Sequence, residues 1–194
     1  MTLVGKKVPD IKMKAVIKNK FDEDFSLSNF HGKYVIFFFY PLDFTFVCPT
    51  ELIAFQKKLE EFKKKNCEVV ACSIDSLFSH LAWLNTPKDQ GGIQGVEYPI
   101  VSDITKEISK AYGTLNEEEG IAFRGLFLID KDGIIRHELI NDLFLGRSID
   151  EAMRVLDALI SHETHGEVCP ANWREGESTM KPTNEGVRKY LSEN

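Results

Sequence analysis

The chain has 194 residues, of which 43% are hydrophobic and 28% are charged, as is ordinary for globular proteins. This length predicts one domain, with room for an appendage, and it buries a core without help from disulfides. A formal net charge of −6 argues against a general nucleic-acid or anionic-membrane binder, because such a binder needs a basic face.

Neither end of the sequence carries a recognisable targeting signal. The opening residues, MTLVGKKVPDIKMK, show no apolar segment followed by a small-residue cleavage site. No stretch approaches the roughly 18 consecutive apolar residues that cross a bilayer. We therefore expect a cytoplasmic protein with no membrane partner.

The first part of the sequence predicts strands that alternate with helices. The run at 33–40 is continuously apolar, which is typical of a strand buried on both faces. A helix is expected over 46–65, because its large apolar residues recur on one helical face. In chain order, the expected elements are strands at 11–17, 21–30 and 33–40, a helix at 46–65, a strand at 68–74, a helix at 77–85, a strand at 98–101 and a helix at 106–112.

The later part predicts a hairpin, a helix and a tail. Strands at 123–129 and 134–140 flank Asp-Lys-Asp-Gly, a strong turn sequence. A helix is expected from Ser148 to about residue 161, because Ser-Ile-Asp-Glu is a capping box. Beyond residue 165 the sequence is polar and interrupted by proline and glycine, with one short helical stretch near 187–191.

This order of elements defines the expected fold class. Early strand–helix alternation implies parallel strands with right-handed crossovers, and the late hairpin adds antiparallel strands. The result is an α/β protein of thioredoxin-like type, with a mixed central sheet flanked by helices. We expect this domain to cover residues 1–165, and an irregular C-terminal tail to cover residues 166–194.

Cys48 is the cysteine with the strongest local case for reactivity. It lies in the first turn of a predicted helix, where unpaired N–H groups and the helix dipole stabilise a thiolate. Pro49 is tolerated there, and Thr45 can direct its hydroxyl at the sulfur or at an incoming oxygen. No histidine is near, so an arginine such as Arg124 is the candidate for the activating charge. A buried structural cysteine is the alternative.

The other cysteines have simpler interpretations on sequence grounds. Cys67 and Cys72 bracket a predicted strand and are expected to fill the core. His162, His165 and Cys169 have a spacing that a zinc site could use, but this interpretation is the weaker one.

Two motifs resemble those of the typical two-cysteine peroxiredoxins. YPLDFTFVCPTE at 40–51 matches the PxxxTxxC signature, and GEVCPANW at 166–173 is similar to the second cysteine motif of that branch. Arg124 in FRGLFLID and Arg147 in NDLFLGRS match two further family segments. The similarity extends from about residue 4 to residue 190.

The resemblance implies a thiol peroxidase that reduces hydrogen peroxide and organic hydroperoxides. Cys48 would be the peroxidatic cysteine, whose thiolate attacks a hydroperoxide oxygen and becomes a sulfenic acid. Thr45 would hydrogen-bond the peroxide, and Pro41 would shield the pocket from water.

The resemblance also implies that electrostatics, and no metal or organic cofactor, supports the reaction. Arg124 would hold the thiolate and polarise the O–O bond. Glu51 and Arg147 would orient Arg124 from behind.

By the same resemblance, Cys169 would be the resolving cysteine. It would form an intersubunit disulfide with Cys48, after the first helical turn around Cys48 unfolds. Thioredoxin or a similar dithiol protein would then reduce the bridge. Members of the family form homodimers and often decamers. A holdase chaperone or a redox-signal relay is the alternative function.

Two departures from the family pattern concern over-oxidation. Peroxide-sensitive members carry GGLG and a C-terminal Tyr-Phe, which slow unfolding around the peroxidatic cysteine. The corresponding segments here read Gly-Gly-Ile-Gln at 91–94 and Tyr-Leu at 190–191. We therefore predict intermediate resistance to over-oxidation.

Overall fold

The computed structural model describes residues 2–193, and the chain divides into two compact units, residues 1–149 and 150–194. A seven-stranded sheet organises the first unit, in the order β2-β1-β5-β4-β3-β8-β9. Its strands are β1 (Met13–Ile17), β2 (Lys20–Phe25), β3 (Tyr34–Phe39), β4 (Cys67–Ser73), β5 (Ile100–Ser102), β8 (Arg124–Ile129) and β9 (Ile135–Asn141).

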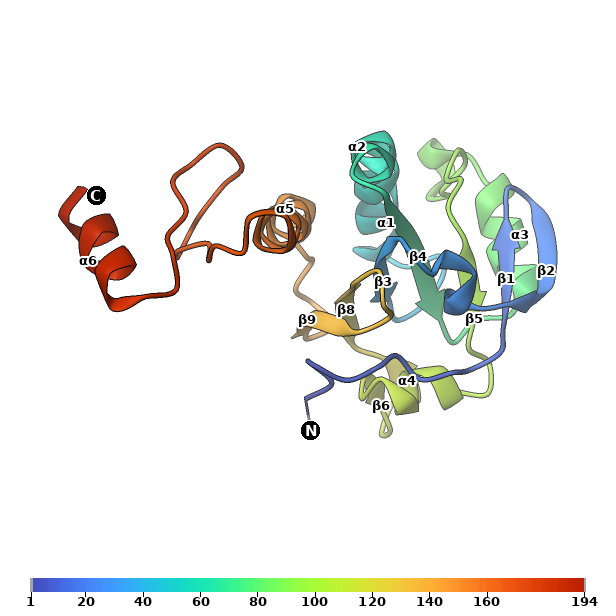
Figure 1. Ribbon diagram of the computed structural model, residues 1–194. Coiled ribbons are helices and arrows are strands. Elements are labelled where there is room, and N and C mark those ends of the chain that lie inside the picture. The colour runs from blue at the N-terminus through green and yellow to red at the C-terminus, as the bar shows by residue number, and fades with distance from the viewer. Residues whose placement is uncertain (1, 194) are drawn as a thin grey trace. The chain divides into compact units, whose positions relative to one another are not determined.

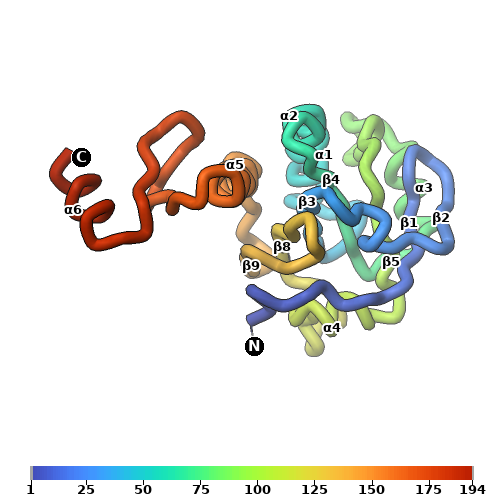
Figure 2. The backbone as a smooth tube through the Cα atoms, in the orientation of Figure 1, coloured from blue at the N-terminus to red at the C-terminus, as the bar shows by residue number. Residues whose placement is uncertain are grey.

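The sheet is mixed. The three central strands β3, β4 and β5 are parallel, whereas β1–β2, β1–β5, β3–β8 and β8–β9 are antiparallel pairs. In Figure 2, the blue strands β1 and β2 lie at one edge of this sheet and the orange strand β9 lies at the other. The hairpin predicted around Asp-Lys-Asp-Gly is the β8–β9 pair.

Helices cover both faces of the sheet (Figure 1). All six residues of β3 are buried, and successive side chains point to opposite faces. Phe37 joins a core cluster with Ile108 of α4 (Glu107–Ala111). Phe38 stacks on Phe55 of α1 (Cys48–Lys57), with ring centroids 4.3 Å apart. The mixed α/β architecture of thioredoxin-like type predicted from the sequence is thus confirmed.

The helix predicted over 46–65 is two helices. α1 begins at Cys48, and α2 (Leu59–Lys64) follows after Lys58, whose ψ of 5° leaves the α-helical conformation. The apolar face continues across the break, because Leu52, Phe55, Leu59 and Phe62 are all buried. Periodicity alone does not reveal the break, since one non-helical residue hardly disturbs the pattern.

Further short elements complete the first unit. α3 is Leu77–Asn85, as predicted, and it contacts β1 and β5. A two-stranded ribbon, β6 (Leu115–Asn116) and β7 (Ile121–Ala122), was not predicted, because each strand has only two residues. Two 3₁₀ turns, η1 (Leu27–Phe30) and η2 (Lys88–Gln90), complete the connections.

The second unit contains two helices and a looped connection. α5 (Ile149–His165) begins at the division between the units, and α6 (Asn184–Glu193) ends the described chain. Both are longer than predicted. A single antiparallel bridge joins Val168 to Met180 across the loop. The units divide at residue 149, whereas the sequence prediction divides the chain after residue 165, at the end of α5.

Within residues 2–193, no helix combines the length and the apolar character needed to cross a membrane.

Candidate active site

Cys48 is the first residue of α1 and is buried, with 1% of its surface exposed. No side chain of the described residues caps this helix N-terminus, and Pro49 lies within its first two positions. The positive end of the helix dipole therefore lies beside the sulfur. This location favours a thiolate over a thiol.

Arg124 supplies a positive charge next to that sulfur. It is the first residue of β8, and its Nη1 lies 3.4 Å from Cys48 Sγ. The same Nη1 donates to Glu51 Oε2 at 2.7 Å, and Nε donates to the Leu143 carbonyl at 2.7 Å. The guanidinium is therefore fixed in direction by two acceptors before any substrate arrives.

Glu51 and Arg147 form the support behind Arg124. Arg147 donates to Glu51 Oε1 from its backbone N at 2.9 Å and from Nε at 2.8 Å, and to Oε2 from Nη2 at 2.9 Å. Its Nη1 donates to the carbonyls of Phe39 and Gly125, at 2.7 and 2.6 Å. Arg147 thus ties α1 to β3 and β8.

The side chains of Glu51, Arg124 and Arg147 beside Cys48 carry a net positive charge. Burial alone would raise the pKa of the Glu51 carboxyl, but hydrogen bonds and charge from Arg147, together with the charge of Arg124, hold that pKa below its usual value. Glu51 is therefore an anion. One carboxylate cannot neutralise two guanidiniums, so a thiolate at Cys48 would balance the remaining positive charge.

Thr45 and Pro41 lie in the loop between β3 and α1. Pro41 is buried directly after the strand. The hydroxyl of Thr45 donates to the Leu42 carbonyl at 2.9 Å, which leaves its oxygen lone pairs as acceptors. Phe44 has φ of 53°, a conformation that is uncommon for an aromatic residue. The contacts around this loop therefore hold its backbone in one conformation.

A buried polar network that the sequence pattern does not predict lies under the same loop. Asp43 accepts from the Tyr40 hydroxyl at 2.7 Å and from the Ser79 hydroxyl at 2.7 Å, and its Oδ2 lies 2.9 Å from His80 Nδ1. His80 Nε2 lies 3.2 Å from the Val101 carbonyl. Asp43 and His80 are far apart in sequence, so only the fold brings them together.

Asp75 extends this network. Its Oδ2 accepts from the Asp43 backbone N at 2.9 Å and from the Ser73 hydroxyl at 2.6 Å. Burial, and then the nearby Asp43 charge, raise the pKa of the Asp75 carboxyl above its usual value. Burial and Asp43 likewise raise the pKa of Tyr40. These groups fix the loop that leads to Cys48.

The remaining cysteines lie elsewhere. Cys67 and Cys72 are buried in β4, as expected, and burial raises the pKa of both thiols. Cys169 is half-buried in the second unit, so its pairing with Cys48 stays a prediction. The Nδ1 atom of His162, one of the residues considered for zinc, lies 2.8 Å from the Glu167 carbonyl.

Comparisons with known families identify the class of protein. Residues 4–138 match the AhpC/TSA family, and residues 158–193 match the C-terminal domain of 1-Cys peroxiredoxin. The chain belongs to the AhpC/TSA family and is a peroxiredoxin, as the motifs predicted.

Individual relatives agree with this assignment. The chain is 53% identical to Peroxiredoxin-1 of Gallus gallus, over 97% of this chain and 95% of the relative. The solved structure of a reduced 2-Cys peroxiredoxin from Plasmodium vivax is 49% identical, with a TM-score of 0.95 over 99% of this chain and 100% of that one. A modified Plasmodium yoelii Prx1a that forms an artifactual octamer is 51% identical, with a TM-score of 0.77 over 87% and 98% of the two chains.

The protein is therefore a thiol peroxidase, and an oxidoreductase by class. These names do not favour the alternative of a holdase chaperone or a redox-signal relay.

Proposed function

We propose that Cys48 is the peroxidatic nucleophile and that Cys169 of a second copy resolves the oxidised cysteine. One observation carries the first assignment: Arg124 Nη1 lies 3.4 Å from Cys48 Sγ, in a buried cluster with an excess of positive charge. That charge stabilises the thiolate and any negative charge that develops on a bound peroxide.

The oxidation step follows from this geometry. The Cys48 thiolate attacks one oxygen of the hydroperoxide, a S–O bond forms and the O–O bond breaks. The second oxygen leaves with the bond's electrons and takes up a proton, which gives water or an alcohol, and Cys48 becomes a sulfenic acid. Thr45 accepts the peroxide O–H, because its own hydrogen is committed to the Leu42 carbonyl. Pro41 limits the access of water.

The proposed cycle closes with an exchange of thiols. Cys169 attacks the Cys48 sulfenic acid and forms an intersubunit disulfide, and thioredoxin or a similar dithiol protein reduces it. Because Cys48 is buried, the first turn of α1 must open before Cys169 can reach it. We place the protein in the cytoplasm, where such dithiol reductants keep cysteines reduced.

We further propose that the chain forms a homodimer and that dimers assemble into a decamer. β9 is an edge strand, and exposed apolar residues lie on it and just after it, namely Ile140, Phe144 and Leu145. A second set of exposed aromatic residues belongs to β2, the Cys48 loop and α3, namely Phe21, Phe44, Phe46 and Phe78. An edge strand and clustered aromatic residues are typical of surfaces that pair with another copy.

A non-reducing gel and a peroxide-consumption assay test the cysteine assignments. Peroxide should convert the wild-type protein to a covalent dimer, and neither Cys48→Ser nor Cys169→Ser should form it. Cys67→Ser is the matched control, because this thiol is buried outside the site, and it should behave as wild type. If Cys48→Ser consumed peroxide at the wild-type rate, Cys48 would not be the nucleophile.

A further inference from the structure

Arg154 of α5 binds both a carboxylate on its own helix and a backbone carbonyl of the loop that follows the helix. Its Nε and Nη2 donate to the two carboxylate oxygens of Glu151, both at 2.7 Å. Its Nη1 donates to the Trp173 carbonyl at 3.1 Å. The first contact orients the planar guanidinium, and the second ties it to the loop that follows Cys169.

Cys169 is brought to the same face of α5. Its Sγ lies 3.6 Å from the Ala158 carbonyl. Ala158 follows Arg154 by four residues, so the two are neighbours on one side of the helix. Cys169 therefore lies against the turn of α5 that follows Arg154. The hydrogen bond to Glu151 raises the pKa of Arg154, and the charge interaction with Cys169 adds to this effect.

The turn after Cys169 is well fixed. The Trp173 backbone N donates to the Pro170 carbonyl at 3.2 Å, and its indole Nε1 donates to the Glu177 carbonyl at 3.0 Å. Asn172 has φ of 63°, which the tight turn requires. Trp173 is buried, although it lies in a loop. A contact to the Trp173 carbonyl therefore fixes the position of the whole 169–173 segment.

We propose that Arg154 is a positioning residue for Cys169, which holds the segment on α5 and stabilises the Cys169 thiolate for the resolution step. This inference rests on the proposed role of Cys169 as the resolving cysteine.

The chemistry explains why a cation is useful here. In the resolution step the Cys169 thiolate attacks the Cys48 sulfenic sulfur, a S–S bond forms and the S–O bond breaks. The hydroxide that leaves combines with the proton of the Cys169 thiol to give water, so no external oxidant is needed. The Ala158 carbonyl accepts the S–H group and thus favours the neutral thiol. A nearby guanidinium counteracts this preference.

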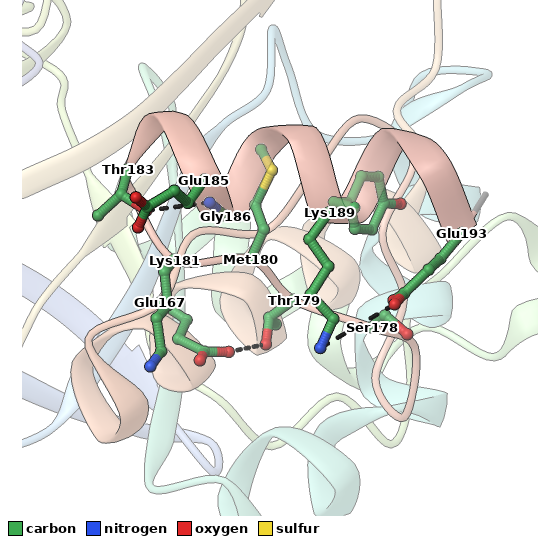
Figure 3. A pocket seen from close by; sticks show the side chains of 11 residues that line it. Glu167, Ser178, Thr179, Met180, Lys181, Thr183, Glu185, Gly186, Lys189 and Glu193 are labelled. Atoms are coloured by element: carbon green, nitrogen blue, oxygen red, sulfur yellow. Dashed lines mark hydrogen bonds and ion pairs between the residues drawn. The ribbon is translucent and has the colours of Figure 1, made fainter.

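The other charged groups of this unit have defined partners or positions. Figure 3 shows the Glu167 carboxylate in the pocket beside α6, hydrogen-bonded to the Thr179 hydroxyl. In the same view, Lys189 pairs with Glu193. α5 also carries Asp150, Glu151, Asp157, His162, Glu163 and His165, and the loop after Cys169 carries Arg174, Glu175 and Glu177. Of these, Glu151 reduces the net effect of Arg154 most directly, because it binds the guanidinium through both oxygens.

Stopped-flow kinetics on the full chain separates oxidation of Cys48 from disulfide formation. In Arg154→Gln, we expect disulfide formation at pH 7 to be slower by about tenfold, and the pH profile of its rate to move to higher pH. The rate of Cys48 oxidation should not change. Arg154→Lys keeps the charge, so it should retain the wild-type pH profile. Arg136→Gln, which removes an arginine from a half-exposed ion pair with Asp130, is the matched control.

Two results would overturn the inference while leaving the proposed function intact. One is an Arg154→Gln protein whose resolution rate and pH profile match those of Arg136→Gln. The other is equal slowing in Arg154→Gln and Arg154→Lys with no change in the pH profile, because that pattern indicates a purely structural role. If Cys169→Ser still formed the disulfide, the resolving role itself would be wrong, and this inference would fail with it.

Discussion

Replacing Glu51 by glutamine should destabilise the protein strongly, although the two side chains have nearly the same shape. Oε2 of Glu51 accepts from Arg124 and from Arg147, and an amide NH₂ in its place cannot accept either bond. Each hydrogen bond to a charged group contributes about 1.5–3 kcal/mol, so the loss of two predicts about 3–6 kcal/mol. Breaking a buried ion pair by removing one partner typically costs about 3–5 kcal/mol, which lies within this range.

Urea unfolding followed by tryptophan fluorescence measures this loss. Protein concentration must be constant, because association adds to apparent stability. Glu60→Gln is the control, since it breaks a solvent-exposed pair with Lys63 at 2.8 Å and should leave the free energy of unfolding nearly unchanged. Equal effects of Glu51→Gln and Glu60→Gln would refute the idea that the buried cluster is electrostatically coupled.

The pH dependence of the same comparison has a definite sign. The folded state lowers the pKa of Glu51, so its contribution to stability is complete above the unfolded pKa, about 4.3. The contribution is lost as the pH falls through the lower, folded pKa. The stability difference between wild type and Glu51→Gln should therefore be constant near pH 7 and shrink in acid.

Three further predictions concern ionisation and oxidation. Asp75→Asn should raise the free energy of unfolding at pH 7, because the folded state raises the pKa of Asp75 and thus disfavours its anion; the gain should disappear in urea titrations below about pH 4. Iodoacetamide at pH 8 should label the half-buried Cys169, and also Cys48 when the first turn of α1 opens, but not Cys67 or Cys72, which burial within β4 keeps neutral and inaccessible; mass spectrometry of peptides gives the answer. Graded peroxide should produce sulfinic acid at Cys48 at intermediate and higher doses, and its appearance at low doses would contradict the predicted intermediate resistance.

The sequence predicts the main elements because their signals are local. The β3 run has no polar residue to place it at a surface, and the Asp-Lys-Asp-Gly turn directs β8 back into β9. Arg124 was a candidate from its position at the start of a predicted strand and from the resemblance of FRGLFLID to a family segment. The structure places its Nη1 3.4 Å from the Cys48 sulfur, which is the arrangement that a charge partner needs.

The sequence does not predict contacts between segments that are far apart in the chain. Asp43 and His80 each have ordinary neighbours in sequence, and neither lies in a pattern that indicates burial of charge. Their pairing depends on how the Cys48 loop crosses the start of α3, which is a property of the packed fold. Arg154 is similar, because an arginine beside a glutamate on a helix usually indicates only a solvated ion pair.

The weak start of α1 has a consequence for how fast the enzyme can recover after each turnover. Its first turn has no side-chain cap among the described residues, Pro49 has no N–H to donate, and the backbone N atoms of Thr50 and Glu51 both donate to the Val47 carbonyl. Opening this turn breaks the bonds that converge on the Val47 carbonyl, including one from the Thr50 hydroxyl at 2.6 Å, whereas the Glu51 side chain remains bound to two arginines. We expect the opening proposed for the catalytic cycle to stop at Glu51, so that Arg124 and Arg147 keep their places while Cys48 moves away and returns. We therefore expect the first turn of α1 to close again while the hydrogen bonds among Glu51, Arg124 and Arg147 stay intact.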